Sequence, residues 1–465
     1  MDPEPMAPSR VLFVTGRLAE QPLRRVVAGL PNSAGIVPEV TILGVSVAAL
    51  MHVDLLRRRL QVPAGIDRVV VPGWCQGDLA VLQEQFGVPF ERGPKDLHDL
   101  PEFFGQGKRP PADLSQFDIE IIAEINHAPR LCDEEIVAQA RALDADGADL
   151  IDLGCIPGES WARAGAVTKL LCGEGLRVSI DSFDRREVEE AVAAGAELVL
   201  SVNATNREWA AQLPAELVAI PDDPRALPTL QATVDFLRGA GARFRIDPII
   251  EPIGFGFAAS LGRYLTARHQ WPDLEIMMGI GNLTELTEVD SAGLNVTLLG
   301  FCQELGIRSV LTTQVINWCR STVREVDLAR RLVWYAIHNR AVPKHLDSGL
   351  VMLRDPQDRH LEDDEIRQLA LAIKDPSFRI FAEGGELHVI NRDGHRRGTD
   401  PFELFEQLGN VDPAHAFYLG YEMAKAVTAL TLGKNYKQDE ALQWGFLTHP
   451  ETSHRNRPDA GDSPV

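Results

Sequence analysis

Positive charge is scarce in this 465-residue chain, which has 46 Lys and Arg residues against 67 Asp and Glu residues and a formal net charge of −21. A nucleic-acid backbone and an anionic membrane both bind proteins through basic surfaces, so we expect neither as the main partner. A local basic pocket for a phosphorylated small molecule is still compatible with this balance.

Long apolar runs and cysteine motifs are also missing. No apolar run reaches the roughly 20 residues that a membrane-spanning helix needs, and the opening MDPEPMAPSR lacks the basic-then-apolar layout of a signal peptide. The six cysteines are scattered without a CxxC spacing, which is typical of reduced thiols and not of a disulfide framework or zinc knuckle. We therefore expect a cytoplasmic protein.

Residues 1–110 predict a small parallel α/β domain of the flavodoxin or Rossmann type. RVLFVTG (10–16), VTILGVSV (40–47) and DRVVVPG (67–73) have the composition of buried strands, with helical patterns between them. The first strand leads into VTGRLAE, which matches neither GxGxxG nor GxxxxGK[ST], so no nucleotide site is expected there. The run GQGKRPPADLSQ (105–116) has the composition of a linker.

Residues 118–345 alternate between strand and helix patterns eight times. The expected strands are 119–125, 148–154, 177–182, 196–203, 216–221, 243–248, 275–281 and 308–313; the expected helices are 133–147, 159–173, 184–195, 205–213, 224–240, 257–268, 285–305 and 321–338. This number and spacing predict a closed (β/α)8 TIM barrel, which typically takes about 250 residues. A doubly wound open sheet is the alternative, but such sheets do not usually continue for eight units of even length.

Residues 355–450 predict a third, α+β domain. The segment 378–408 reads as strands turning at Gly384-Gly385 and again at Asp393-Gly394, and 413–432 reads as a helix. The polar tail 451–465 has the composition of a disordered segment. The fold class is therefore α/β, with a central barrel between a small parallel domain and a C-terminal α+β domain.

Polar residues close most of the predicted barrel strands. They are Asn126, Asp152, Asp181, Asn203, Asp247, Gly281-Asn282 and, on the last strand, Thr312, Thr313 and Gln314. A TIM barrel places its active site at these strand ends. Because a buried carboxylate without a partner costs several kcal/mol, the cluster needs donors from amide side chains or from a ligand.

Each of these residues also has a structural interpretation. Asp152 could cap the next helix, while Ser182 or Asp184 could cap in place of Asp181, and Asp247 before Pro248 could simply start a turn. Their convergence on one end of one barrel favours a flat, nitrogen-rich heterocycle. An aminopyrimidinone edge offers adjacent N–H donors that one carboxylate accepts in a fork, and its carbonyl suits amide partners. A divalent metal is the rival ligand for such a set.

Several motifs in 118–340 resemble the pterin-binding barrel family of dihydropteroate synthases and corrinoid-linked methyltransferases. Asp152-Leu153-Gly154 with Glu159-Ser160 resembles "DxGGES", residues 179–182 resemble "SIDT", and Asp247-Pro248 with Gly254–Phe257 resembles "DPGxGFGK". The segment GIGNLTELTEVDSAGLNVTLLGFCQELGI (279–307) is similar to the methyltransferase branch. The layout with two outer domains and GKNYKQDEALQWG (433–445) resembles synthase-related proteins of archaea and methylotrophs that are associated with tetrahydromethanopterin.

The resemblance implies a transferase that condenses 6-hydroxymethyl-7,8-dihydropterin pyrophosphate with 4-(β-D-ribofuranosyl)aminobenzene 5′-phosphate. Asp181 and Asp247 would hold the pterin's N–H groups, with Asn203 or Ser201 as the further polar partner. Asn126 would meet the pyrophosphate and its Mg²⁺. The resemblance also implies a homodimer, formed through the last barrel helices, whose ligands are a pterin and a phosphorylated arylamine.

The chain departs from the synthases in its basic residues. Gly281-Asn282 stands where they carry Lys, and Thr312–Gln314 replaces an Arg-x-His pair; Arg130, His127 and Arg320 are possible substitutes. Two alternatives therefore stay open: a pterin-dependent methyl or one-carbon transferase, in which Asn282 faces the reactive nitrogen, and a pterin-binding scaffold without catalysis. Cys132 and Cys155 lack zinc-site spacing and are expected to be structural.

Overall fold

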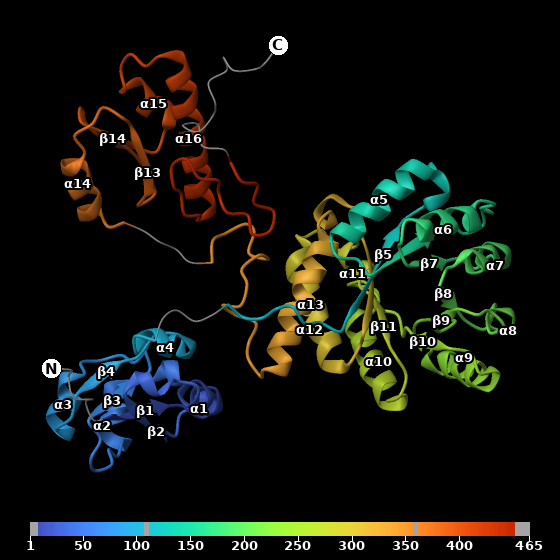
Figure 1. Ribbon diagram of the computed structural model, residues 1–465, viewed down its shortest axis with the longest axis horizontal. Helices are drawn as coiled ribbons and strands as arrows, with labels where there is room; N and C mark the ends of the chain where they lie inside the picture. Colours follow the sequence, from blue (N-terminus) through green and yellow to red (C-terminus); the bar gives the residue numbers. More distant parts are fainter. Residues whose placement is uncertain (1–7, 107–110, 357–360, 452–465) are drawn as a thin grey trace. The chain divides into compact units, whose positions relative to one another are not determined.

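The computed structural model describes residues 8–106, 111–356 and 361–451 (Figure 1). The chain divides into two compact units, Met1–Ala112 and Asp113–Val465. Apart from Glu451, the tail predicted as disordered lies outside the described residues. None of the described helices is long and apolar enough to cross a membrane.

The first unit is built on a parallel four-stranded sheet in the order β2-β1-β3-β4. Its strands are β1 (Ser9–Thr15), β2 (Ile36–Ile42), β3 (Arg68–Val71) and β4 (Phe90–Arg92), and its helices are α1 (Glu20–Ala28), α2 (Val53–Arg59), α3 (Ala80–Phe86) and α4 (Leu100–Phe103). Leu12 and Val14 enter one apolar cluster while Val11 and Phe13 enter another, so the central strand is buried on both faces. The predicted small parallel domain is confirmed; its fourth strand was not predicted.

The second unit contains the eight-stranded parallel barrel that the alternation predicts. Its strands are β5 (Glu120–Ile125), β6 (Leu150–Gly154), β7 (Val178–Asp181), β8 (Leu198–Val202), β9 (Glu216–Ala219), β10 (Phe244–Ile246), β11 (Met277–Gly279) and β12 (Ser309–Thr313). The sheet order runs β10-β9-β8-β7-β6-β5-β12-β11. A parallel bridge between Ile246 and Ile276 joins the two ends, so the sheet closes.

Helices surround these strands (Figure 1). They are α5 (Asp133–Ala145), α6 (Ala164–Gly173), α7 (Arg185–Ala194), α8 (Arg207–Ala210), α9 (Leu227–Ala240), α10 (Phe257–Gln270), α11 (Gly281–Thr284), α12 (Ser291–Leu305) and α13 (Thr322–His338). The prediction that the seventh strand ends at Gly281-Asn282 is wrong, because β11 ends at Gly279 and these two residues begin α11. α6 likewise begins at Ala164 and not at 159.

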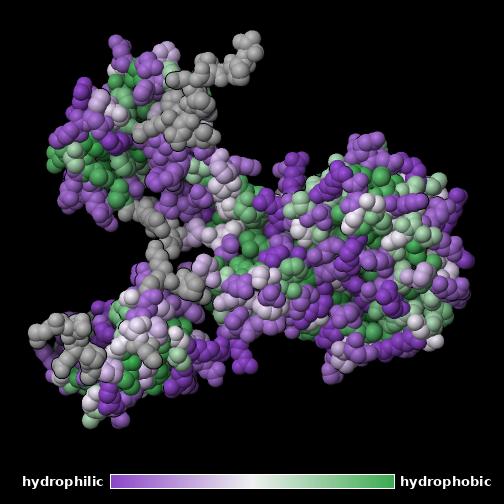
Figure 2. All heavy atoms as spheres, viewed as in Figure 1, coloured by the Kyte–Doolittle hydropathy of each residue, from purple (hydrophilic) through white to green (hydrophobic). Residues whose placement is uncertain are grey.

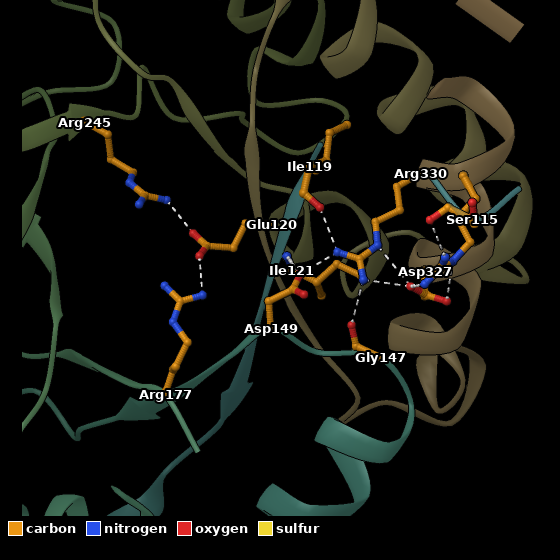
Figure 3. A network of polar contacts seen from close by, with 11 residues as sticks. Ser115, Ile119, Glu120, Ile121, Gly147, Asp149, Arg177, Arg245, Asp327 and Arg330 are labelled. Atoms are coloured by element: carbon orange, nitrogen blue, oxygen red, sulfur yellow. Dashed lines mark hydrogen bonds and ion pairs between the residues drawn. The ribbon is translucent and has the colours of Figure 1, made fainter. Parts of the chain in front are cut away.

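Residues inside the barrel form layers. Ile122, Leu150, Leu198, Leu200, Val218 and Met277 fill the middle as a separate apolar cluster. At the N-terminal end, Arg245 and Arg177 pair with Glu120 at 2.8 and 2.9 Å (Figure 3). Arg245 also donates to Glu216 at 2.7 Å. The carboxylates of Glu120 and Glu216 at this end of the barrel therefore have arginine partners.

A fully buried arginine fixes the segment that leads into the barrel. Arg330 of α13 donates to the Ile119 and Gly147 carbonyl oxygens at 2.8 and 3.2 Å and pairs with Asp149 and Asp327 (Figure 3). Its guanidinium also lies 3.7 Å from the centre of the Phe117 ring. One side chain thus connects the entry to β5, the loop before β6 and the last barrel helix.

The C-terminal part of this unit is α+β, as predicted. An antiparallel sheet β13-β14-β15 (Arg379–Glu383, Glu386–Asn391, Gly394–Gly398) packs against α16 (Pro413–Leu432) around an apolar cluster of its own. Helices α14 (Asp363–Ala372) and α15 (Pro401–Glu406) complete it. Figure 2 shows hydrophilic side chains spread widely over the visible faces, with apolar ones between them.

Replacing Arg330 by Met should lower the free energy of unfolding of the barrel by about 3–5 kcal/mol, because Asp149 and Asp327 would lose a buried partner. Urea unfolding followed by far-ultraviolet circular dichroism measures this loss. The matched control is Arg141→Met, which removes an exposed pair with Glu174 and should cost at most about 1 kcal/mol. Equal losses in the two variants would contradict the role given to Arg330.

Candidate functional site

The carboxyl ends of β6 and β7 bring two predicted carboxylates into the barrel interior. Asp152 shares its face of β6 with Leu150, and Asp181 lies on the face of β7 opposite to Ile180, which packs against the outer helices. Asp152 is completely buried, and its Oδ1 accepts a hydrogen bond from Ser179 at 2.6 Å. Its Oδ2 has no hydrogen-bond partner among the described residues. Asp152 therefore lies in mid-strand and caps no helix.

Asp181 is also free of a capping role. The side chain of Asp184 caps α7 by accepting from the backbone N–H groups of Arg186 and Glu187. Asp181 instead receives a hydrogen bond from the Ser201 hydroxyl. It is half-buried, so one of its edges is open to a ligand.

Glu124 is a third carboxylate in this cluster, and the sequence analysis missed it. It pairs in register with Asp152, and a Cβ atom at Gly154 would collide with its carboxylate, so the glycine makes room for it. On the other side of Glu124, the Thr313 hydroxyl donates a hydrogen bond to Glu285 at 2.6 Å. The available signal was the pattern IEIIAEI, which puts Glu120 and Glu124 four residues apart on the same face of a buried strand.

Asp247 follows β10 and is 5% exposed. Its Oδ1 accepts from the Tyr264 hydroxyl at 2.5 Å and from the Ile249 N–H at 2.7 Å. The second bond is the Asp-Pro turn that the structural interpretation expected. It occupies Oδ1, and the Gly279 backbone N–H is a further donor to the carboxylate.

Backbone strain is concentrated at the same strand ends. Three of the six described non-glycine residues with positive φ are His127 after β5, Ser201 in β8 and Ile249 after β10, at 53°, 68° and 63°. The register of β8 also shifts between Val199 and Val202, and this bulge directs the Ser201 hydroxyl to Asp181. Such conformations cost about 1–3 kcal/mol each and are typical of functional sites.

Positive charge is missing from the cluster. Among the described residues Glu124, Asp152 and Asp181 form no ion pair, in contrast to the carboxylates at the other end of the barrel. Near Asp247, Arg263 instead pairs with Glu251 at 2.9 Å. Arg130 is mostly exposed and lies 3.8 Å from Glu159. The carboxylates of Glu124, Asp152 and Asp181 therefore form an acidic group that no ion pair within the described residues neutralises.

Burial and mutual repulsion raise the pKa values of these groups. Burial, followed by the charges of Asp181 and Glu285, raises the pKa of Glu124 to about 7. Burial and the neighbouring carboxylates raise the pKa of Asp152 well above its usual range. Burial also raises the pKa of Asp181, against the hydrogen bond from Ser201, and raises that of Asp247 to about 6.

Ser201 and Asn203 have different partners. Ser201 contacts Asp181, whereas the Asn203 side-chain oxygen accepts from the N–H and hydroxyl of Thr205 at 2.9 and 2.7 Å. The Asn203 oxygen therefore stabilises its own turn, and the binding role of either residue stays a prediction.

Gln314 is also used inside its own loop. With its amide oriented to satisfy both groups, it donates to the Arg320 carbonyl at 2.9 Å and accepts from the Val323 N–H at 3.0 Å. These two bonds connect Gln314 to the start of α13. Its assignment to substrate binding stays a prediction.

Gly281, Asn282 and Asn126 lie at the mouth. A Cβ atom at Gly279 would be within 4 Å of both Asp247 Oδ2 and Asn282 Nδ2, so these groups border the same space; Asn282 also donates to the Ile250 carbonyl at 3.2 Å. Gly281 is buried against Glu285 and Thr313. Asn126 follows β5, and its side chain forms no hydrogen bond within the described residues.

No group of three or more His, Cys, Asp or Glu residues is arranged to hold a metal ion in the described parts of the chain. Cys132 is exposed while Cys155 is half-buried.

Residues 9–95 match the model of a family of unknown function, DUF6513. Uncharacterized protein MJ0107 of Methanocaldococcus jannaschii is 24% identical over 92% of this chain and 98% of its own length. Among solved structures, dihydropteroate synthase of Thermus thermophilus is 22% identical, with 48% of this chain and 96% of that chain covered and a TM-score of 0.38. The enzyme of Xanthomonas albilineans with 7,8-dihydropteroate is 22% identical, at 49% and 95% coverage and a TM-score of 0.38.

Glu124→Gln should stabilise the protein at alkaline pH. The pKa of Glu124 is about 7 in the folded chain against an ordinary value of 4.5, so the wild type loses stability as the pH rises between these values and stays lower above them. Glutamine has no such loss. We expect the variant to gain about 1–3 kcal/mol near pH 8 and nothing near pH 4.

Thermal unfolding at the two pH values measures this difference. The control is Glu189→Gln, which changes an exposed glutamate paired with Arg185. A gain of the same size at both pH values, or a gain in the control, would show that the repulsion around Glu124 is not its source.

Proposed function

We propose that the barrel mouth binds the N–H edge of a pterin and that the protein is a dihydropteroate synthase-like transferase. The observation that carries this proposal is the set of inward-facing carboxylates at the mouth without cationic partners, with Asp152 Oδ2 unsatisfied among the described residues. Such oxygens need a ligand that supplies several N–H donors. A 2-amino-4-oxo pyrimidine ring supplies adjacent amino and ring N–H groups on one flat edge.

Asp181 and Asp247 are the residues assigned to the ring edge. Asp181 accepts from Ser201, and Asp247 accepts from Tyr264, Ile249 and the Gly279 N–H. Because a carboxylate has about four acceptor positions on its two oxygens, each keeps acceptor capacity for the ring. Asn126, Asn282 and Arg130 border the mouth and are assigned to the substituent that leaves the ring. We assign the ring to the deep part of the site because the carboxylates lie there. The reactive carbon and its substituent are then nearer to the mouth.

In the proposed reaction the C–O bond between the pterin methylene and pyrophosphate breaks, and a C–N bond to the arylamine forms. The arylamine nitrogen loses one proton, which passes to solvent. The protein contributes by orienting the two substrates and by stabilising the charge on the methylene through the acidic lining. The specific arylamine, 4-(β-D-ribofuranosyl)aminobenzene 5′-phosphate, comes from the resemblance of the sequence.

Mg²⁺ fits this site as an ion that arrives with the pyrophosphate. It is commonly held by one or two protein oxygens together with substrate phosphates, and Asn126 has an uncommitted side-chain amide at the end of β5. When bound, the ion neutralises charge on the leaving oxygens. Asn126 would orient that leaving group.

A second candidate function is a pterin-dependent one-carbon transferase. The observation in its favour is the unneutralised negative charge at the mouth, which repels a pyrophosphate but suits a neutral or cationic one-carbon pterin. In that reaction Asn282 would lie beside the ring, next to Asp247.

Asp181→Asn should weaken the binding of 6-hydroxymethyl-7,8-dihydropterin about 10- to 100-fold, because the ring loses a charged acceptor. Isothermal titration calorimetry measures the affinity. Asp184→Asn is the matched control: it is three residues away and caps α7, a role that Asn performs equally well. Unchanged affinity in Asp181→Asn would contradict the proposed placement of the pterin against Asp181.

Assays of turnover distinguish the candidate functions from one another. Release of pyrophosphate from the pterin pyrophosphate, dependent on both arylamine and Mg²⁺, is expected of the synthase. Demethylation of a methylated pterin in the presence of a corrinoid would favour the one-carbon transferase. Tight pterin binding without either reaction would contradict both enzymatic proposals and leave a binding protein.

A further inference from the structure

Asp247 has an asymmetric environment. Its Oδ1 accepts from Tyr264 and Ile249, and the Gly279 backbone N–H is a further donor to the carboxylate. Its Oδ2 faces Gly279, where a Cβ atom would lie 3.7 Å from this oxygen and 3.8 Å from Asn282 Nδ2. Because Gly279 has no side chain, this second oxygen and the Asn282 amide face the same space.

Tyr264 comes from α10 and is completely buried. Its ring packs edge-on against Phe301 of α12, with 6.4 Å between the ring centres. Burial and the nearby Asp247 raise the pKa of Tyr264 well above its usual range. Its hydroxyl therefore stays protonated and donates a hydrogen bond to Asp247. The tyrosine is therefore a fixed donor on an immobile ring.

The neighbouring residue on α10 holds the turn that carries Asp247. Arg263 donates to the Ile249 carbonyl at 2.9 Å and pairs with Glu251. Ile249 has a φ of 63°, which is a strained conformation for a β-branched residue. A strained turn persists only when its surroundings enforce it, and here two adjacent residues of α10 do so.

We propose that Tyr264 is a positioning residue of the pterin site: its hydroxyl holds one oxygen of Asp247 so that the other faces the bound ring. This inference rests on the proposed function. It assigns to α10 a role that no motif in the sequence indicates, since Tyr264 itself lies too deep to touch the ligand.

The consequence is a specific dependence of binding on pH. The groups facing Asp247 are Tyr264 and Arg263 from α10 and Cys302 from α12. Burial raises the pKa of Asp247 to about 6, and the hydrogen bond from Tyr264 opposes that rise. Without the hydroxyl, more of Asp247 is protonated at neutral pH and cannot accept from the ring.

Tyr264→Phe tests the inference, because it removes the hydroxyl and keeps the ring against Phe301. The probe is 6-hydroxymethyl-7,8-dihydropterin, titrated into the full chain at several pH values. We expect the pH at which affinity is lost to move upward, so that a one-unit move weakens binding about fivefold at pH 6, approaches tenfold at lower pH, and has hardly any effect near pH 9. Ionisation of the ligand itself cancels in the ratio of variant to wild type.

The control is Tyr436→Phe. Tyr436 donates to Glu422 at 2.6 Å in the C-terminal part of the chain, so this variant loses the same kind of hydrogen bond away from the barrel. Its binding profile should follow the wild type. A second readout is the number of protons released on binding near neutral pH, obtained by calorimetry in two buffers, which should be larger for Tyr264→Phe.

The outcomes separate this inference from the proposed function. If the wild type binds no pterin, both fail. If the wild type binds but Tyr264→Phe loses affinity equally at every pH, or releases no additional protons, Tyr264 has only a packing role and this inference alone is overturned. A shift to higher pH of the point at which affinity is lost, seen in Tyr264→Phe and absent in Tyr436→Phe, supports the inference.

Discussion

A carboxylate inside a barrel requires a cation or several hydrogen-bond donors, and this requirement organises the two ends of the barrel differently. At the N-terminal end, Arg177 and Arg245 neutralise Glu120 and Glu216, and the end is closed. At the C-terminal end, the carboxylates of β5, β6 and β7 have hydroxyl donors or no partner within the described residues. The carboxylates at the N-terminal end are stabilised by their arginines. Those at the C-terminal end can gain a comparable stabilisation only from a ligand.

The open end is nevertheless rigid. Ser201 and Ile249 hold strained backbone conformations next to Asp181 and Asp247, and hydroxyl groups on β7 and α10 each donate to a single carboxylate oxygen. These interactions orient the acceptors before any ligand arrives, which lowers the cost of ordering them on binding. The repulsion and strain reduce stability, as is common where function requires uncompensated groups.

The same electrostatics bear on the choice of substrate. A ring with an N–H edge gains from each carboxylate, whereas a free pyrophosphate would be repelled by all of them. The proposed pyrophosphate chemistry would therefore require a cation at this mouth, whereas the proposed one-carbon chemistry would not. The position of Asn126 and Asn282 outside the carboxylate layer is compatible with either substituent.

The sequence by itself determined the eight βα units and the carboxylates that end the strands, because the periods of two and 3.6 residues are local properties of the chain. It also indicated the parallel first domain and the turns of the C-terminal sheet. Asp152 and Asp181 were found by reading each strand to its end. Only the tertiary structure decided which polar residues meet. The bulge in β8 places Ser201 against Asp181, and α10 places Tyr264 against Asp247. These pairings depend on contacts between distant segments, which no periodicity within a strand or helix records.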